Sequence, residues 1–376
     1  MAANARNEMD GPDVGLLKEG ESPVAKAKTK KQPVKAKSGK AKKSPKRPAK
    51  FRPMNVFVAP GSRAEKHYRE MALPMAAVVQ AIAPKFPPTP EHNLINHGGK
   101  TIQNLVYTNF FIGGASSWAE ADIERIDQAL AAAMADTNLN NVMMQYFKNK
   151  PITTTFKPSH ILPGARPSQF SQGDVEQLVK SLFLQGALQG FDFNSTVFNF
   201  LLPSGTVLTT DIDPTSAISP AGNAAAIHVE DEASSLHGLG GYHGSVHPIG
   251  TVTIYYSIGV FSERRPNGSD NGIVAFDQPW KNVIVTFYHE LNEARTDPDV
   301  EDAIRAGNSS KAVSFLGWTS LQGEECGDFP ITEAGTDLSL VMKEVNLTNG
   351  DRKVPVQFQY SNAVQGPEGP IPQPHV

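Results

Sequence analysis

The sequence predicts an α+β fold in which helices pack on a mixed sheet, preceded by a disordered basic tail. Three observations support this prediction. The chain has 376 residues, of which 39% are hydrophobic, and this is enough to bury a sizeable core. Segments with helical and with strand-like composition follow one another without strict alternation, which favours a mixed sheet. A lysine-rich stretch near the N-terminus lacks the apolar residues that folding requires.

The predicted tail covers residues 1–52, which hold 15 of the 35 Lys and Arg but only 5 of the 38 Asp and Glu. The rest of the chain therefore carries 20 basic and 33 acidic side chains. The Lys, Ala and Pro repeats of the tail resemble those of linker histones, and such a polyelectrolyte binds nucleic acid or another anionic surface without sequence preference. A solubilising or spacing role is the alternative.

The remainder divides into a Pro-rich lead-in, residues 53–94, and a globular domain, residues 95–376. The lead-in contains one helical stretch at 65–83. The first clear strand of the domain is 102–113, because its aromatic and branched side chains end in two glycines. The sequence shows no internal repeat of 20–50 residues, so a solenoid or propeller is not expected.

Three helices are expected where apolar residues recur every three or four positions. The first runs to Ala135 and has Ser117 as its expected N-cap. The other two cover residues 138–147 and 172–189.

Three more strands follow these helices. Residues 195–202 and 205–210 are expected to form a hairpin, because Pro203 and Ser204 between them favour a turn. After a Gly- and Ser-rich loop, the run TVTIYYSIGV at 251–260 has the composition of a central strand.

The most specific stretch is VIVTFYHELNEART, residues 283–296, whose apolar residues share one helical face. His289 and Glu293 share another face, and their spacing of one turn suits the binding of one zinc ion. Glu290 stands where HExxH zincins have the glutamate that takes a proton from the attacking water. Here Glu293 replaces the second His of that motif. The alternative is a solvated helix face with a His–Glu hydrogen bond.

Further ligands are available on both sides of this helix. Downstream, the loop GEECGD supplies Glu324, Glu325 and Asp328. Upstream, GGYHGSVHP places His243 and His247 in what we expect to be a Gly-rich loop, from which a His could reach the same ion. After the helix, ARTDPD gives an acidic turn with a proline, which is typical of a helix end.

Other histidines have a simpler interpretation. His92 and His160 lie in polar or Pro-flanked surroundings, which favour the surface. His97 opens an HGG sequence whose glycines are expected to serve a tight turn.

Several of these segments together resemble the phosphate-induced, EXORDIUM-like family. The segment HGGKTIQNLVYTNFFIGG is similar to the opening HGG-plus-strand pattern of that family, and GYHGSV is similar to its GYHG loop. HELNEARTDP resembles its HELxEAxTNP helix, and ECGD falls where the family has EIGD. The resemblance covers residues 95–330 in the family's order.

The resemblance implies a zincin-like active-site helix with His289 and Glu293 as metal ligands. It also implies that Glu290 is the water-activating base and that Glu325 or Asp328 is the third ligand. This chain departs from the plant members of the family it resembles, which are secreted and contain several cysteines.

The sequence therefore predicts a metal-binding domain, with zinc preferred over another divalent cation, that acts as a peptidase-like hydrolase on a peptide or protein substrate. The alternative is a non-catalytic binding or signalling module with a structural ion and a tail that docks to anionic partners. A closed site of four protein ligands, including His243, would favour that alternative.

Cysteine content and hydropathy bear on the location of the chain. Cys326 is the one cysteine, so neither an intramolecular disulfide nor a Cys-based zinc cluster can form. The N-terminal residues lack a signal-peptide pattern, and no apolar run approaches the ~20 residues that span a bilayer. We therefore expect a soluble protein without a membrane span, in the cytoplasm.

Overall fold

The computed structural model describes residues 55–66, 86–210, 234–307, 310–350 and 352–375. The predicted tail, and nearly all of the helical stretch predicted at 65–83, lie outside the described residues. All described residues belong to one unit that spans residues 48–376. The fold of this unit is α+β, with a mixed sheet and packed helices.

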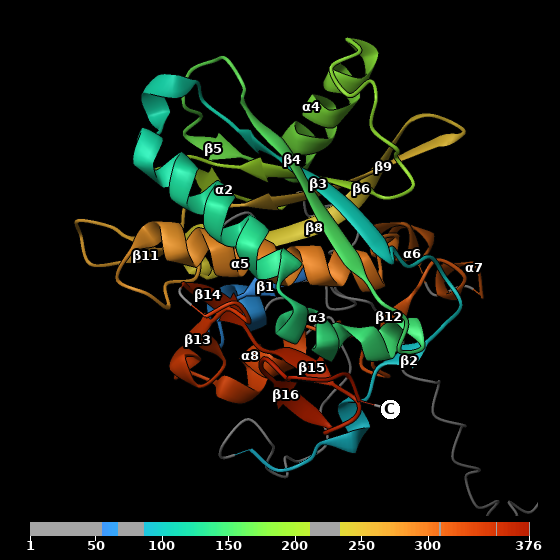
Figure 1. Ribbon diagram of the computed structural model, residues 1–376. Helices are drawn as coiled ribbons and strands as arrows, with labels where there is room; N and C mark the ends of the chain where they lie inside the picture. Colours follow the sequence, from blue (N-terminus) through green and yellow to red (C-terminus); the bar gives the residue numbers. More distant parts are fainter. Residues whose placement is uncertain (1–54, 67–85, 211–233, 308–309, 351, 376) are drawn as a thin grey trace, which may run out of the picture. The chain divides into compact units, whose positions relative to one another are not determined.

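A six-stranded sheet forms the centre of this unit (Figure 1). Its strand order is β1-β8-β9-β6-β3-β4. The strands β9, β6, β3 and β4 run parallel to one another, whereas β8 is antiparallel to both of its neighbours, β1 and β9. Their bounds are β1 Val56–Val58, β3 Asn104–Phe111, β4 Thr153–Ile161, β6 Thr196–Leu201, β8 Leu239–Ile249 and β9 Val252–Gly259.

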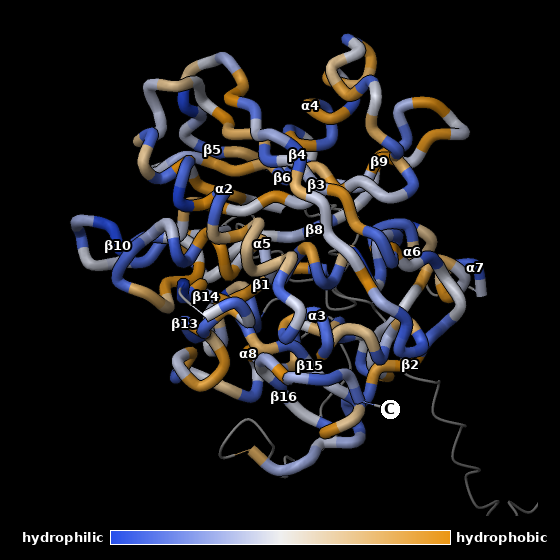
Figure 2. The backbone as a smooth tube through the Cα atoms, viewed as in Figure 1, coloured by the Kyte–Doolittle hydropathy of each residue, from blue (hydrophilic) through white to orange (hydrophobic). Residues whose placement is uncertain are grey.

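Helices cover both faces of the sheet. Helices α2 (Glu120–Ala135) and α5 (Pro279–Thr296) pack on one face, where their apolar side chains share a core with β3 and β6. Helix α4 (Gln172–Leu184) packs on the other face. Figure 2 shows hydrophobic and hydrophilic residues alternating along α2, as expected for a helix that buries one side only.

Helix α5 is buried on all sides rather than on one. Every residue of it from Asn282 to Thr296 is buried, because the hairpin of β13 (Met342–Asn346) and β14 (Lys353–Gln357) covers the side opposite the sheet. Glycines let the helix approach the strands closely. A Cβ at Gly241 on β8 would lie 2.5 Å from the carbonyl oxygen of Ile258 and 3.0 Å from Thr286 of α5.

Shorter elements complete the described part of the chain. The helices are α3 Thr137–Met143, α6 Val300–Ala306, α7 Ser310–Val313 and α8 Asp328–Ala334. The short strands pair as β2 Ile95–Asn96 with β12 Trp318–Thr319, β5 Gln169–Phe170 with β7 Val207–Leu208, β10 Glu263–Arg264 with β11 Asp270–Asn271, and β15 Gln359–Ser361 with β16 Gly366–Glu368. Among the described residues, no helix has both the length and the apolar content needed to cross a bilayer.

Much of the element order agrees with the sequence prediction. The strand predicted at 102–113 is β3, and the strand predicted at 251–260 is β9, which lies inside the sheet. The helix predicted at 138–147 is α3 followed by a 3-10 turn that ends at Phe147. Helix α5 contains the predicted 283–296 stretch and ends immediately before Asp297 and Pro298.

Two predicted connections are wrong. The expected hairpin of 195–202 and 205–210 does not form, because β6 pairs on both sides with parallel partners and β7 pairs with β5 instead. The expected Gly-rich loop around GGYHGSVHP is strand β8. Its glycines do not make a loop but leave room for packed neighbours: Gly240 for Phe57 of β1, Gly241 for α5 and Gly244 for Glu301 of α6.

Smaller differences concern element ends. Ser117 does not cap α2, since its hydroxyl donates to the carbonyl oxygen of Gly113 and the helix begins at Glu120. Helix α4 ends at Leu184, before the predicted limit of 189. The predicted lead-in contributes β1, which forms an edge of the main sheet.

Candidate metal centre

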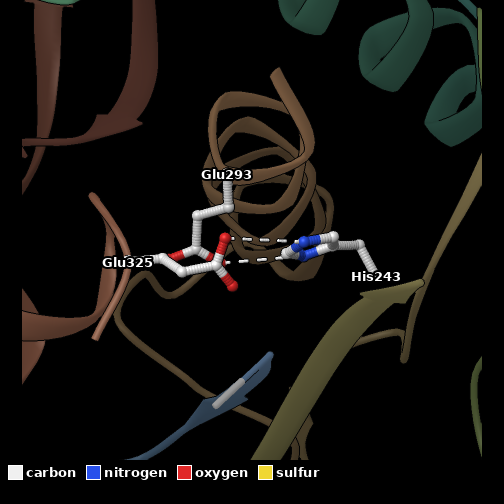
Figure 3. A group of neighbouring side chains, drawn as sticks. All are labelled: His243, Glu293 and Glu325. Atoms are coloured by element: carbon white, nitrogen blue, oxygen red, sulfur yellow. Dashed lines mark ion pairs between the residues drawn. The ribbon is translucent and has the colours of Figure 1, made fainter. Parts of the chain in front are cut away.

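Buried acidic and imidazole side chains from three segments meet beside α5. His243 comes from β8, Glu290 and Glu293 come from α5, and Glu325 comes from the loop before α8. Each of them is at most 1% exposed. Figure 3 shows His243, Glu293 and Glu325 pointing toward one another from different segments.

Two groups of three residues have donor atoms close enough to hold an ion. In the first group, atoms of His243, Glu293 and Glu325 all lie within 4.8 Å of one another. In the second group, the same is true of His289, Glu290 and Glu293. Glu293 belongs to both groups, so it lies at the centre of the cluster.

The distances within the cluster are those of direct contacts. Nδ1 of His243 lies 3.2 Å from Oε2 of Glu290 and 3.9 Å from Oε2 of Glu293. Nε2 of His243 lies 3.6 Å from Oε1 of Glu325. Nε2 of His289 lies 3.0 Å from Oε2 of Glu293.

The backbone around His243 determines which of its nitrogens carries the proton. Nε2 lies 3.3 Å from the carbonyl oxygen of Asp297, and a carbonyl oxygen can only accept a hydrogen bond. The neutral ring therefore carries its proton on Nε2. Nδ1 then directs a lone pair toward the carboxylates of Glu290 and Glu293, which also offer only lone pairs when ionised.

The carboxylates outnumber the donors that could neutralise them. Asp297 and Asp328 are also buried here, and each accepts one backbone N–H, from Gly317 and from Glu325 respectively. In the described part of the chain, Oε1 of Glu290 and both carboxylate oxygens of Glu325 have no hydrogen-bond partner. In each ion pair described for the cluster, the basic partner of the glutamate is a histidine.

The nearest buried arginine does not neutralise the cluster. Arg295 lies on α5, but its guanidinium donates to the carbonyl oxygens of Gln103 and Thr153 at the start of β3 and β4. Its role is to join the end of α5 to those strands.

Burial shifts the pKa values of all these groups toward their neutral forms. Burial raises the pKa of Glu293 to about 8, although the N–H of Gly327 opposes the shift. Burial, followed by the charge of Glu293, raises the pKa of Glu290 and of Glu325 well above the usual range. Burial lowers the pKa of His243 to about 3 and that of His289 to about 4. In the metal-free chain these shifts favour neutral imidazoles and protonated carboxyl groups, so a cation that binds the carboxylates must displace their protons.

The structure brings together the residues that the sequence singled out, with differences in detail. His243, His289, Glu290, Glu293 and Glu325 meet. Asp328 is buried beside them, but its Oδ2 accepts the N–H of Glu325, and the residue belongs to neither group of three. The expected alternative of a solvated helix face is wrong, because the helix is buried on every side.

Other residues of the sequence analysis lie outside the cluster. Glu324 pairs with His92 at 2.6 Å, and the ring of His92 stacks on Phe329, so the expected surface position of His92 is wrong. His247 is exposed and pairs with Asp302. His97 contacts Thr319, and Gly98 beside it lies at a bend with a φ of 91°, a conformation that favours glycine.

Three residues of the site were not predicted. Asp297 orients His243 through its carbonyl oxygen, Gln357 on β14 contacts His289 at 3.0 Å, and Phe57 on β1 packs on the His289 ring at 4.2 Å between centroids. Asp297 belongs to the acidic turn ARTDPD that was predicted at the end of the helix, so this pattern could have identified it as a site residue. Gln357 and Phe57 come from segments that are distant from His289 in the sequence, and no sequence pattern around them indicates a contact with it.

This donor set suits a divalent cation. Two imidazole nitrogens favour zinc, and the surplus of carboxylates also suits manganese or calcium.

No family model matches the chain, and the searches of curated proteins and of solved structures found no match either.

Proposed function

We propose that the protein binds one divalent cation, with zinc preferred, and that it is a hydrolase of the peptidase type. The ligands are His289, Glu293, His243 and Glu325. The ion would polarise a substrate carbonyl and make an attacking water more acidic. Membership of the EXORDIUM-like family is part of the same proposal and rests on the sequence resemblance.

The observation that carries the proposal is the convergence of lone pairs on Glu293. Nδ1 of His243 lies 3.9 Å from Oε2 of this carboxylate, and Nε2 of His289, which makes no hydrogen bond among the described residues, lies 3.0 Å from it. An isolated buried carboxylate costs several kcal/mol unless a proton, a donor or a metal compensates it. A cation bound at either group of three would compensate Glu293, which belongs to both.

Glu290 is assigned the role of base. Its Oε2 contacts His243, while its Oε1 is buried and has no hydrogen-bond partner among the described residues. A raised pKa brings a carboxylate closer to the pH at which a general base works best. Glu290 would then accept the proton of the attacking water and later deliver it to the leaving group.

The second candidate function is a structural ion in a non-catalytic module. It is favoured by the complete burial of His243, His289, Glu293 and Glu325, since structural zinc sites have four protein ligands and no open position. In this function the ion fastens β8, α5 and the loop before α8 together, and the basic tail docks to anionic partners.

Elemental analysis of the full chain, purified with added zinc and then desalted, tests the metal site. One equivalent of zinc is expected in the wild type and none in His243→Ala. His247→Ala is the matched control, because His247 lies on the same strand but pairs with Asp302 at the surface. A wild-type chain without bound metal, or equal zinc in both variants, would overturn the proposal.

A further inference from the structure

From the contacts of β14, we infer that Gln357 is a positioning residue that fixes the protonation of His289, so that Nε2 of this ring is the nitrogen available to a metal. The inference rests on the proposed metal site for its functional meaning. Gln357 belongs to the C-terminal hairpin, beyond residues 95–330, the segment that carries the family resemblance. Its side chain is 1% exposed.

The contacts of the Gln357 side chain fix the orientation of its amide. Its nitrogen lies 2.6 Å from the carbonyl oxygen of Gly327. Because a carbonyl oxygen can only accept, the NH₂ end of the amide must face Gly327. The amide oxygen therefore faces the other way, where it lies 3.0 Å from Nδ1 of His289.

The oriented amide in turn fixes the protonation of the His289 imidazole. The amide oxygen of Gln357 can only accept, so Nδ1 of His289 must carry the proton. A neutral imidazole has one N–H. Nε2 therefore has a lone pair; this buried nitrogen makes no hydrogen bond among the described residues and lies 3.0 Å from Oε2 of Glu293.

The contacts close into a ring of four residues. Gly327 donates its N–H to Oε1 of Glu293 at 3.0 Å and accepts the amide of Gln357 with its carbonyl oxygen. The N–H of Gly327 thus orients the carboxylate of Glu293. The carbonyl oxygen of Gly327 orients the amide of Gln357, and this amide orients the imidazole of His289. Such supporting hydrogen bonds typically change metal affinity by roughly 10–100-fold when removed.

The test uses the full chain with ¹⁵N-labelled histidine and compares wild type with Gln357→Met, which keeps the side-chain length but removes both polar ends. Proton–nitrogen correlation spectra of the metal-stripped protein report which nitrogen of His289 is protonated, and the His289→Gln spectrum assigns the signals. We expect protonated Nδ1 in the wild type and loss of this preference in Gln357→Met. Zinc affinity should fall by roughly 10–100-fold in the variant.

Gln359→Met is the matched control, because Gln359 is equally buried and contacts the backbone of Gln357 rather than His289. It should keep the wild-type protonation and zinc affinity. A wild-type His289 protonated on Nε2 would overturn the inference, and so would a Gln357→Met chain with unaltered protonation. Failure of the wild type to bind zinc would overturn the proposed function instead, while the spectra of the metal-stripped protein would still decide the inference.

Discussion

Gly327 lies against the ring of His289 so closely that no larger residue fits between them. A Cβ at position 327 would be 2.3 Å from Nδ1 of His289 and 2.9 Å from Oε1 of Glu293. The backbone φ of Gly327 is −93°, so glycine is required there for space and not for conformation. This contact lets one loop residue hold both a carboxylate and, through Gln357, an imidazole of the candidate site.

The first prediction is that Gly327→Ala disrupts the metal site. The added methyl group would push the His289 ring away from Glu293, and overpacking of this kind costs about 1–3 kcal/mol. We expect a lower free energy of unfolding and loss of bound zinc. Gly250→Ala is the control, because a Cβ at Gly250 meets no atom within 4 Å. Normal zinc content in Gly327→Ala would show that the close contact does not support the site.

The second prediction separates the base from the ligands. Glu290→Gln should retain the zinc that the wild type binds, because the ligand set does not include Glu290. Hydrolysis of an unstructured peptide mixture should fall by roughly 10²–10⁴-fold, since the amide cannot accept a proton.

The control for this substitution is Glu301→Gln, which changes another buried glutamate that contacts the N–H of Ser245 rather than the cluster. It should keep both zinc and activity. Absence of hydrolysis in a zinc-loaded wild type would favour the structural ion. Loss of zinc from Glu290→Gln would make Glu290 a ligand rather than a base.

Periodicity predicted the elements whose contacts are local. Helix α5 and strand β9 were expected at the right places, because one repeats its apolar residues with the helical period and the other is a continuous run of strand-forming residues. Strand β8 was missed because its glycines, which indicate a loop by propensity, are required by the close packing of β1, α5 and α6 against the strand. The expected hairpin of β6 and β7 failed because strand pairing depends on distant partners.

The same distinction between local and long-range contacts applies to the residues of the candidate site. His289, Glu290 and Glu293 could be found from their spacing on one helix, since that geometry is local. Gln357 could not, because its contact with His289 joins residues 68 positions apart. The burial of α5 on all sides from Asn282 onward could not be predicted either, since it depends on the C-terminal hairpin that covers the helix.

The third prediction concerns the basic N-terminal residues. Removal of residues 1–52 should abolish salt-sensitive retention on heparin, because these residues hold 15 of the 35 Lys and Arg. The melting temperature should stay nearly unchanged, since β1 begins at Val56. A full-length chain with the Lys residues of 26–50 replaced by Gln is the control for charge. Equal retention of the truncated and complete chains would contradict the prediction.

The fourth prediction follows from the raised pKa of Glu293. This pKa is about 8 in the folded chain against 4.5 ordinarily, so between these values the unfolded state is ionised while the folded state holds a proton. The unfolded state then binds fewer protons, and the free energy of unfolding falls as pH rises. His243 and His289 act in the opposite sense, but only below their ordinary pKa of 6.5. The window in which the carboxylates dominate is therefore pH 6.5 to 8.

Urea unfolding of the metal-stripped chain at pH 6.5 and at pH 8 should show this loss of stability. Glu293→Gln should reduce the loss, because an amide does not titrate, whereas Glu344→Gln should not, because Glu344 is a surface partner of Lys281. Excess zinc should abolish the loss in the wild type, since the ion binds the ionised carboxylate and stabilises the folded state more as pH rises. An identical pH dependence in wild type and Glu293→Gln would show that Glu293 is already ionised without a metal, and the charge argument for the site would fail.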